Sequence, residues 1–209
     1  MKTSTKHVIF PSLSERLVLA GCDFHVPLDL IKAERVIRNI VLMITGSALI
    51  ALCAQIYIPL YPIPITMQTF AVFLIGLTYG WRLGGTTILL YLVAGASGLP
   101  VFAKGGLGMT IFAGPTAGFL LGFFFAAMAC GWFAERGFDR SYAKLFVSLL
   151  VGNILLYGFG LFWLGNFIGW DKPVLELGFY PFFIGDLIKI FMVVILLPSV
   201  WKYVNRIKH

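Results

Sequence analysis

The chain has 209 residues, of which 59% are hydrophobic and only 12% are charged. No class of soluble globular protein has this composition, whereas long uncharged apolar runs are typical of membrane-spanning segments. The net charge of +7 does not indicate nucleic-acid binding, because the basic residues lie between the apolar runs, where they act as topology signals. The three cysteines form no CxxC pattern, so neither a disulfide framework nor a cysteine metal site is predicted.

The N-terminal 36 residues mix basic, acidic and apolar residues and lack the continuous apolar core of a cleavable signal peptide. We interpret residues 1–36 as a cytoplasmic leader. The apolar piece Leu13–Leu19 is too short to span a membrane. The leader as a whole either carries a helix lying on the membrane surface or is a plain topology anchor.

A first membrane span is predicted over about residues 37–57, at the start of the run from Asn39 to Trp81 that carries no charge. This span contains Ser47 and Ala51, a small-xxx-small pair that lets another helix approach closely. Two interpretations of this pair stay open. It serves packing within this chain, or it forms a docking surface for a second membrane protein.

A proline-rich stretch follows, with Pro59, Pro62 and Pro64 in six residues. Proline removes a backbone donor and disfavours helix in its predecessor, so this stretch is predicted to be non-helical. Such backbone is tolerated at membrane depth only where it lines a cavity or is buried in protein. Thr66 and Gln68 alternate, so in an extended chain they would point the same way. We predict a lid over a pocket, with a simple rigid turn as the alternative.

Two short spans are predicted next, over residues 69–80 and 83–96, followed by a loop with five glycines that ends at Gly108. Glycine permits unusual backbone conformations and close approach to a ligand. A fourth span is predicted over residues 114–134, because Pro115 suits the first turn of a helix. Its free N–H groups predict a carboxylate site, but the spacing of a nucleotide-binding P-loop is absent.

The fifth predicted span, residues 145–164, carries Asn153 and Tyr157, which are i,i+4 neighbours. A buried asparagine in a membrane must find partners, either within the bundle or in a ligand. The sixth span carries Asp186 and Lys189, which share one helix face at a spacing of three. Charges inside a span are costly, so this pair is either an internal ion pair or a ligand or transport site.

The distribution of basic residues predicts the orientation. Of the sixteen Lys and Arg residues, only Lys104, Lys172 and Lys189 lie outside or within the predicted membrane, and the other thirteen lie on one side. This asymmetry predicts cytoplasmic termini. The sequence thus predicts an all-α integral membrane protein, a six-transmembrane-helix bundle over residues 37–204 with an outward-facing ligand pocket and a cytoplasmic tail at 205–209.

The polar and glycine-rich motifs, taken together and in order, resemble those of the BioY family, the biotin-specific S components of energy-coupling-factor (ECF) transporters. The resemblance covers about residues 37–204. It rests on six stretches: Pro62–Thr69, Leu90–Leu92 with Gly95, Gly98–Phe102, Gly114–Thr116 with Gly118, Gly152–Asn153 with Tyr157, and Gly185–Leu187 with Lys189. Ile184 stands where proline is expected and Phe119 where tyrosine is expected, so no hydrogen bond is assigned to Phe119.

The resemblance implies a six-helix fold whose site takes up biotin with high affinity, and in which Asp186 and Lys189 contact the ligand. Biotin has a ureido ring with two N–H donors and a carbonyl acceptor, an apolar thioether ring and a carboxylate. The remaining roles follow from chemistry alone: polar contacts and apolar walls are expected from Thr66, Gln68, Thr116 and Asn153, and from Tyr91 and Phe102.

The resemblance also implies partners and a location. A chain without a nucleotide site needs a coupling membrane subunit and two ATPase subunits for ATP-driven uptake, and no cofactor is expected. The protein is expected to be multi-pass in a prokaryotic cell membrane, in contact with lipid. Whether it works alone, as a homo-oligomer or with that module stays open.

Two alternatives to biotin uptake remain. One is an S component for another vitamin, and the other is an intramembrane enzyme that uses Asp186 as an acid or base. Against the enzyme, no Ser/His, Cys/His or paired-carboxylate constellation is present, and the histidines lie outside the predicted spans.

Overall fold

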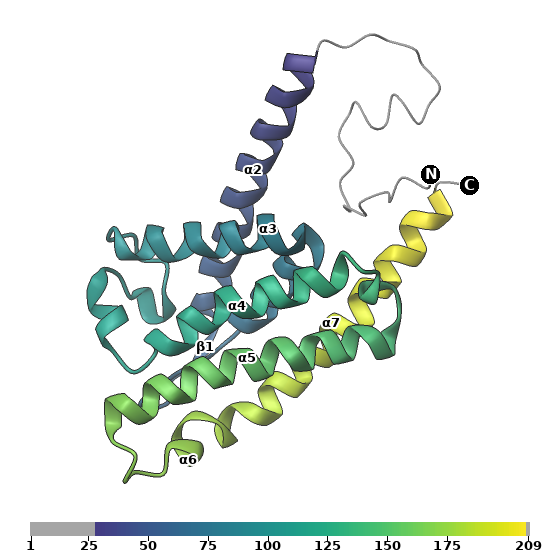
Figure 1. Cartoon of the computed structure of the whole chain (residues 1–209). Helices are drawn as coiled ribbons and strands as arrows, with labels where there is room; N and C mark the ends of the chain where they lie inside the picture. The colour runs from purple at the N-terminus through teal and green to yellow at the C-terminus, as the bar shows by residue number, and fades with distance from the viewer. Residues whose placement is uncertain (1–27, 208–209) are drawn as a thin grey trace.

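The computed structural model describes residues 28–207, with side chains from 33 to 199. The chain is almost entirely helical in this range (Figure 1). Short 3₁₀ turns link some of the helices. The elements in chain order are α2 (Leu28–Gln55), β1 (Tyr57–Ile58), β2 (Ile65–Thr66), α3 (Gln68–Ala96), α4 (Ala117–Ala134), α5 (Tyr142–Ile168), α6 (Val174–Gly178) and α7 (Tyr180–Ile207).

Four of these helices have the length and apolar composition needed to cross a membrane. The qualifying stretches lie in α2, α4 and α5 and across α6 and α7, within the described part of the chain. The prediction of an all-α membrane protein agrees with this finding. The prediction of six spans depends on α3, which is not among these four helices.

Helix α3 is two helical segments joined at Gly80, which has φ 81° and ψ 173°. These angles lie far from the helical region and are readily adopted only by glycine. The chain reverses there: a Cβ built on Gly84 would lie 3.2 Å from the Gly76 Cα. In a straight helix, residues eight apart would be separated by about 12 Å. The two segments therefore form an antiparallel pair, at the place where the sequence predicts two short spans.

The proline-rich stretch is non-helical, as predicted, but it also forms a small hairpin. Strand β1 pairs antiparallel with β2, with Tyr57 opposite Thr66. The Tyr61–Pro62 peptide bond between them is cis. The extended chain ends at Thr66 and α3 begins at Gln68, so these two residues do not share one extended strand. Extended geometry therefore does not apply at Gln68, but the two side chains hydrogen-bond to each other and line the same pocket.

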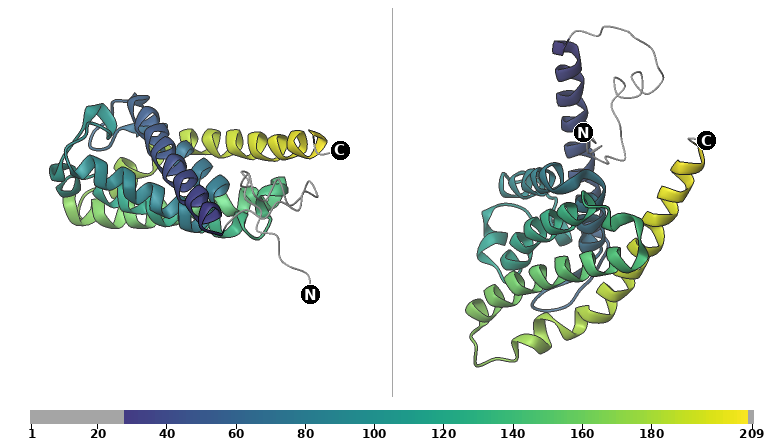
Figure 2. Two further views of the ribbon diagram at one scale, coloured as in Figure 1. Left: turned by 90° about the horizontal axis from the view of Figure 1, so that it is seen from above. Right: turned by 45° about the vertical axis from the view of Figure 1, so that its right-hand side comes forward.

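The connections gather at two opposite ends of the helices (Figures 1 and 2). The β1–β2 hairpin, the loop between α3 and α4, and α6 lie at one end. The α4–α5 connection and the C-terminal end of α7 lie at the other. The turn at Gly80 belongs to this second end, because a Cβ built on Gly80 would lie 2.6 Å from the Oε1 of Glu135, directly after α4. This grouping agrees with the sequence analysis, which puts the proline-rich and glycine-rich loops on the same side.

Two helices differ from the sequence analysis, one in where it begins and one in being present at all. Helix α2 begins at Leu28, so it runs through the boundary drawn between residues 36 and 37. The short helix α6, inserted before α7, is not predicted. Residues 1–27 and 208–209, with most of the leader and part of the tail, lie outside the described residues.

On α2, the face turned to the bundle carries Gly46, Ile50 and Ala54, which are all buried. A Cβ built on Gly46 would lie 2.8 Å from the Thr87 Cγ2, so this glycine sets the close approach to α3. Ser47 and Ala51 lie one position further round the helix and are half-buried. They border the internal interface, so both interpretations of this pair remain.

Candidate functional site

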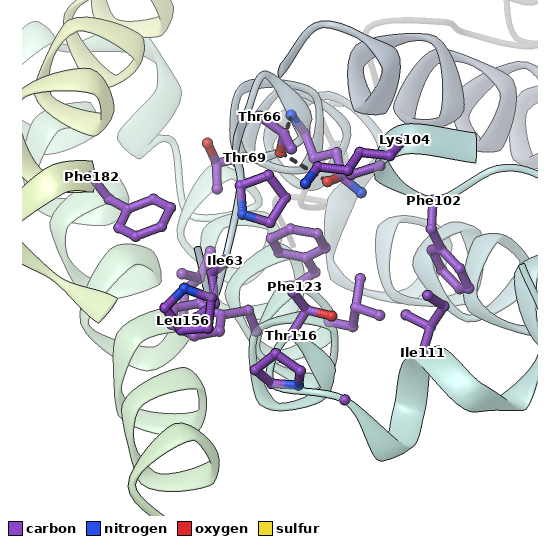
Figure 3. Close-up of a pocket in the computed structure, with 18 of the residues that line it drawn as sticks. Ile63, Thr66, Thr69, Phe102, Lys104, Ile111, Thr116, Phe123, Leu156 and Phe182 are labelled. Atoms are coloured by element: carbon purple, nitrogen blue, oxygen red, sulfur yellow. Dashed lines mark hydrogen bonds between the residues drawn. The ribbon is translucent and has the colours of Figure 1, made fainter. Parts of the chain in front are cut away.

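The hairpin and the helix ends around it enclose a cavity of about 290 Å³, which we call the central pocket. Figure 3 shows Phe182 and Leu156 on the left of the lining residues, Phe102 and Ile111 on the right, and Thr66 and Thr69 at the top. Six of the predicted site residues line the pocket, and they come from four separate parts of the chain: Thr66, Gln68, Phe102, Thr116, Asp186 and Lys189.

Asp186 and Lys189 are both 5% exposed and lie on the pocket-facing side of α7. The Lys189 Nζ is 3.0 Å from the Asp186 Oδ1, as the spacing of three predicts. The ammonium also donates to the Thr66 carbonyl oxygen at 2.7 Å and to the Thr69 Oγ1 at 2.9 Å. An ammonium has three protons, so all the donors of Lys189 are satisfied.

The Asp186 carboxylate is satisfied as well. Its Oδ1 accepts from Lys189 and from the Thr69 hydroxyl at 3.3 Å, and its Oδ2 accepts from the Tyr157 hydroxyl. Thr69 and Tyr157 line the pocket but are not among the predicted site residues. They lie 117 and 29 residues from Asp186 in the chain, so no local spacing indicates either contact.

Gln68 is held from both sides. Its Oε1 accepts from the Thr66 hydroxyl at 2.8 Å, and its Nε2 donates to the Tyr91 hydroxyl at 2.7 Å. Tyr91 in turn donates to the Val101 carbonyl oxygen at 3.1 Å. Tyr91 is fully buried and does not line the pocket. It supports the pocket from behind instead of forming its wall.

Phe102 does form part of the wall. Its ring packs edge-on against Tyr91, with 5.4 Å between the centroids. A Cβ built on Gly95 would lie 2.2 Å from the Phe102 Cζ, so the glycine makes room for this ring. The Phe102 carbonyl oxygen accepts from the Gln55 Nε2 at 3.1 Å, which fixes the loop to the end of α2.

Thr116 precedes α4 and lines the pocket, as the sequence predicts. The predicted carboxylate site at the start of α4 is less well supported. The N–H groups of Ala117, Phe119 and Leu120 donate to carbonyl oxygens of Gly114 and Thr116. Few backbone donors therefore remain for a ligand at this helix end.

Lys104 is a pocket residue that the sequence analysis does not select. It lies in the loop after α3, is exposed, and has φ 60°, a left-handed conformation that residues other than glycine rarely adopt. Strained backbone of this kind clusters at functional sites. Because the donors of Lys189 are taken, the ammonium of Lys104 is the better placed cation for a ligand carboxylate.

The remaining wall is aromatic. Phe119 stacks on Phe182 with 6.4 Å between the centroids and meets Tyr157 edge-on at 6.1 Å. Phe119 therefore contributes an apolar surface, and its lack of a hydroxyl fits its buried position. Phe123 lies beside it on α4. The pocket thus combines apolar rings, a buried carboxylate and a cation near its rim, which suits a small ligand with a donor-bearing head and an acidic end.

Asn153 lies elsewhere, in a second cavity of about 400 Å³ between α5 and α7, which we call the α5–α7 groove. Asn153 is 8% exposed, and its Oδ1 has no hydrogen-bond partner among the described residues. Only two residues line both cavities, Tyr157 and Asp186. Asn153 is thus separated from the central pocket by the Tyr157–Asp186 contact.

Similar proteins of known identity agree with this picture. The family model for the BioY family matches residues 20–206. The biotin transporter BioY of Thermotoga maritima is 38% identical over 69% of this chain and 84% of its own length. The probable biotin transporter BioY of Pyrococcus horikoshii is 36% identical over 73% of this chain and 89% of its own.

A solved structure shares the fold. The crystal structure of the S-component for biotin from an ECF-type ABC transporter matches with a TM-score of 0.69 and 24% identity, over 80% of this chain and 93% of that one. The residues that the family model matches include the hairpin, the glycine-rich loop and α7, all of which contribute to the central pocket. The chain therefore belongs to the BioY family.

Proposed function

We propose that this protein binds biotin in the central pocket and takes it up across the membrane as the substrate-specific component of an ECF-type transporter. The observation that carries the proposal is the buried Asp186–Lys189 pair at the wall of a pocket, in a chain of the BioY family. The relatives are named as transporters, which argues against an intramembrane enzyme.

The pocket has chemistry for each part of biotin. We place the ureido ring at Asp186, because a carboxylate accepts N–H donors strongly. The rings of Phe102, Phe119 and Phe182 provide an apolar surface for the thioether ring. Lys104 is the partner that we assign to the carboxylate. A cavity of about 290 Å³ is close to the lower limit of about 300 Å³ for small-molecule sites, so it suits a ligand as small as a vitamin.

Thr66, Gln68 and Thr116 complete the proposed site as neutral polar contacts. Thr66 and Gln68 already hydrogen-bond to each other, so a ligand that contacts them meets side chains in fixed positions. Tyr91 and Asn153 lie outside the pocket lining, and we assign them supporting roles.

The proposal includes six membrane crossings, with the two segments of α3 counted separately. Both termini are then cytoplasmic, and the pocket end faces outward. The charge asymmetry of the sequence supports this orientation. Energy for uptake comes from a coupling membrane subunit with two ATPase subunits. Lipid surrounds the bundle, and a homo-oligomer is the alternative assembly.

Titration of purified variants with biotin tests the binding site. Asp186→Asn removes a charge-assisted hydrogen bond worth roughly 1.5–3 kcal/mol, so biotin should bind at least ~10-fold more weakly. Thermal stability should also fall, because Lys189 loses its counter-charge in a buried site. Glu176→Gln, which changes an exposed carboxylate of α6, is the matched control and should change neither quantity.

The double variant Asp186→Asn with Lys189→Met separates ligand binding from internal pairing. It removes both charges, so it should regain thermal stability without regaining biotin binding. A double variant that binds biotin as tightly as the parent would show that the pair is purely structural.

Labelling of single cysteines tests the orientation. In a background without Cys22, Cys53 and Cys130, Ser97→Cys should react with an impermeant thiol reagent on intact cells. Ser141→Cys, at the opposite end of the helices, should react only after permeabilisation. The reverse pattern would overturn the proposed topology.

A further inference from the structure

The unpartnered carbonyl of Asn153 has a natural partner one helical turn away. Tyr157 follows it at i+4 on α5, and both side chains line the α5–α7 groove. Long side chains on a helix lean toward the preceding turn, so the Tyr157 ring covers the turn that carries Asn153. Yet its hydroxyl donates to Asp186, and the Asn153 Oδ1 is left without a donor.

A ligand donor meets Asp186 most readily at the Oδ2, because the Oδ1 already accepts from two donors and the Oδ2 from one, the Tyr157 hydroxyl. Thr69 and Lys189 share the Oδ1, and Lys189 also holds the Thr66 carbonyl oxygen, so these groups tie α7 to the start of α3. Tyr157 is the one donor that the structure places on the Oδ2. Displacement of Tyr157 therefore frees a whole carboxylate oxygen and leaves the tie between the helices intact.

The displaced Tyr157 hydroxyl needs a new hydrogen-bond partner. An unsatisfied buried polar group costs about as much as a lost hydrogen bond. The groove gives the ring room on the side away from the central pocket, and its wall carries one unsatisfied buried acceptor among the described residues, the Asn153 Oδ1. A movement of the Tyr157 ring into the groove would give the Tyr157 hydroxyl an acceptor and the Asn153 Oδ1 a donor.

We propose that Tyr157 is a positioning residue whose hydroxyl moves from the Asp186 Oδ2 to the Asn153 Oδ1 when a ligand N–H group takes its place. Asn153 then acts without touching the ligand: it lowers the cost of displacing Tyr157. This inference rests on the proposed function, because the incoming donor is the ureido N–H of biotin.

A double-mutant cycle with biotin titration and ligand-free thermal unfolding tests the exchange. Asn153→Leu removes the second acceptor, so biotin should bind about ten-fold more weakly, the usual effect of leaving a buried hydroxyl unpaired. The unfolding temperature without biotin should stay equal or rise, because the amide has no partner to lose. Asn166→Leu, an exposed amide on the same helix that lines neither cavity, should change neither quantity.

The second arm of the cycle uses Tyr157→Phe, which removes the hydroxyl that has to move. In this background, Asn153→Leu should have no further effect on the affinity for biotin. An equal loss of affinity in both backgrounds would overturn the exchange and assign Asn153 to the ligand itself. Unchanged affinity in Asn153→Leu would overturn it as well.

Asn153→Ala is the second variant if leucine prevents folding, and the same cycle applies to it. Failure of the inference is distinguishable from failure of the proposed function. A parent protein that does not bind biotin overturns the proposed function, and the inference with it. A parent protein that binds biotin while the cycle shows no coupling overturns the exchange alone.

Discussion

Helix α7 is held in the bundle in a different way from α3, α4 and α5. Those three approach one another backbone to backbone: a Cβ built on Gly76 would lie 2.5 Å from the Ala127 carbonyl oxygen, and one on Gly131 would lie 2.4 Å from the Trp81 nitrogen. On α7, a Cβ built on Gly185 meets nothing closer than 3.9 Å.

Polar contacts add to the apolar packing of α7, where Ile190, Val193 and Leu197 are buried in the core. Lys189 and Asp186 reach the Thr66 carbonyl oxygen, Thr69 and Tyr157, while the groove between α5 and α7 stays open. The polar groups that help to fix α7 are therefore also groups that face the central pocket. A ligand that binds there also acts on the attachment of a helix, whereas the glycine-packed helices form a fixed support.

The largest expected effect distinguishes the two lysines of the pocket. Lys189→Met leaves the buried Asp186 carboxylate without its counter-charge, which should lower the free energy of unfolding by about 3–5 kcal/mol and abolish tight biotin binding. Lys104→Met should leave the unfolding temperature unchanged, because Lys104 is exposed and lies in a loop. Thermal unfolding of the two purified variants checks the contrast.

The same two variants also measure the ligand carboxylate contact. Lys104→Met should weaken biotin binding about five-fold, the factor that roughly 1 kcal/mol of a partly exposed ion pair represents. The loss should disappear for a biotin amide, which lacks the negative charge. Equal destabilisation by both substitutions would remove the distinction between a helix-holding lysine and a ligand-facing one.

A smaller effect on stability is expected from the glycine contacts. Gly131→Ala forces a Cβ into the backbone at Trp81, so it should cost about 1–3 kcal/mol despite the better helix propensity of alanine. Gly158→Ala on α5 is the matched control, since a Cβ there meets nothing within 4 Å. It should be neutral or slightly stabilising in thermal unfolding. A Gly131→Ala variant as stable as the control would show that the supporting helices are not closely packed.

The smallest effect on the isolated protein is expected at the edge of α2. Ala51→Trp should spare biotin binding and weaken co-purification with the coupling subunit, if the Ser47/Ala51 face docks that partner. Leu52→Trp, at a side chain that is 68% exposed, controls for the added bulk. Loss of biotin binding with normal assembly would assign the face to packing within this chain.

Local properties of the sequence were enough for the class of protein and part of the site. The charge-free runs predict membrane spans because their length and composition alone decide solubility in lipid. The prolines predict a non-helical lid because they act on the backbone of their own residue and of the one before. The spacing of three puts Asp186 and Lys189 on one helix face without knowledge of any other helix.

The partners of those groups were decided only by the tertiary structure. Tyr157 and Thr69 reach Asp186 across the bundle, from 29 and 117 residues away, and a single sequence has no pattern for contacts between helices. From the sequence, Lys104 is only a cation in a loop, whereas in the structure it lines the central pocket. Tyr91 and Asn153 have side chains suited to a ligand, but they lie behind the wall and in the groove. Residue type and periodicity fix what a side chain can do, whereas the packing of the helices decides what it meets.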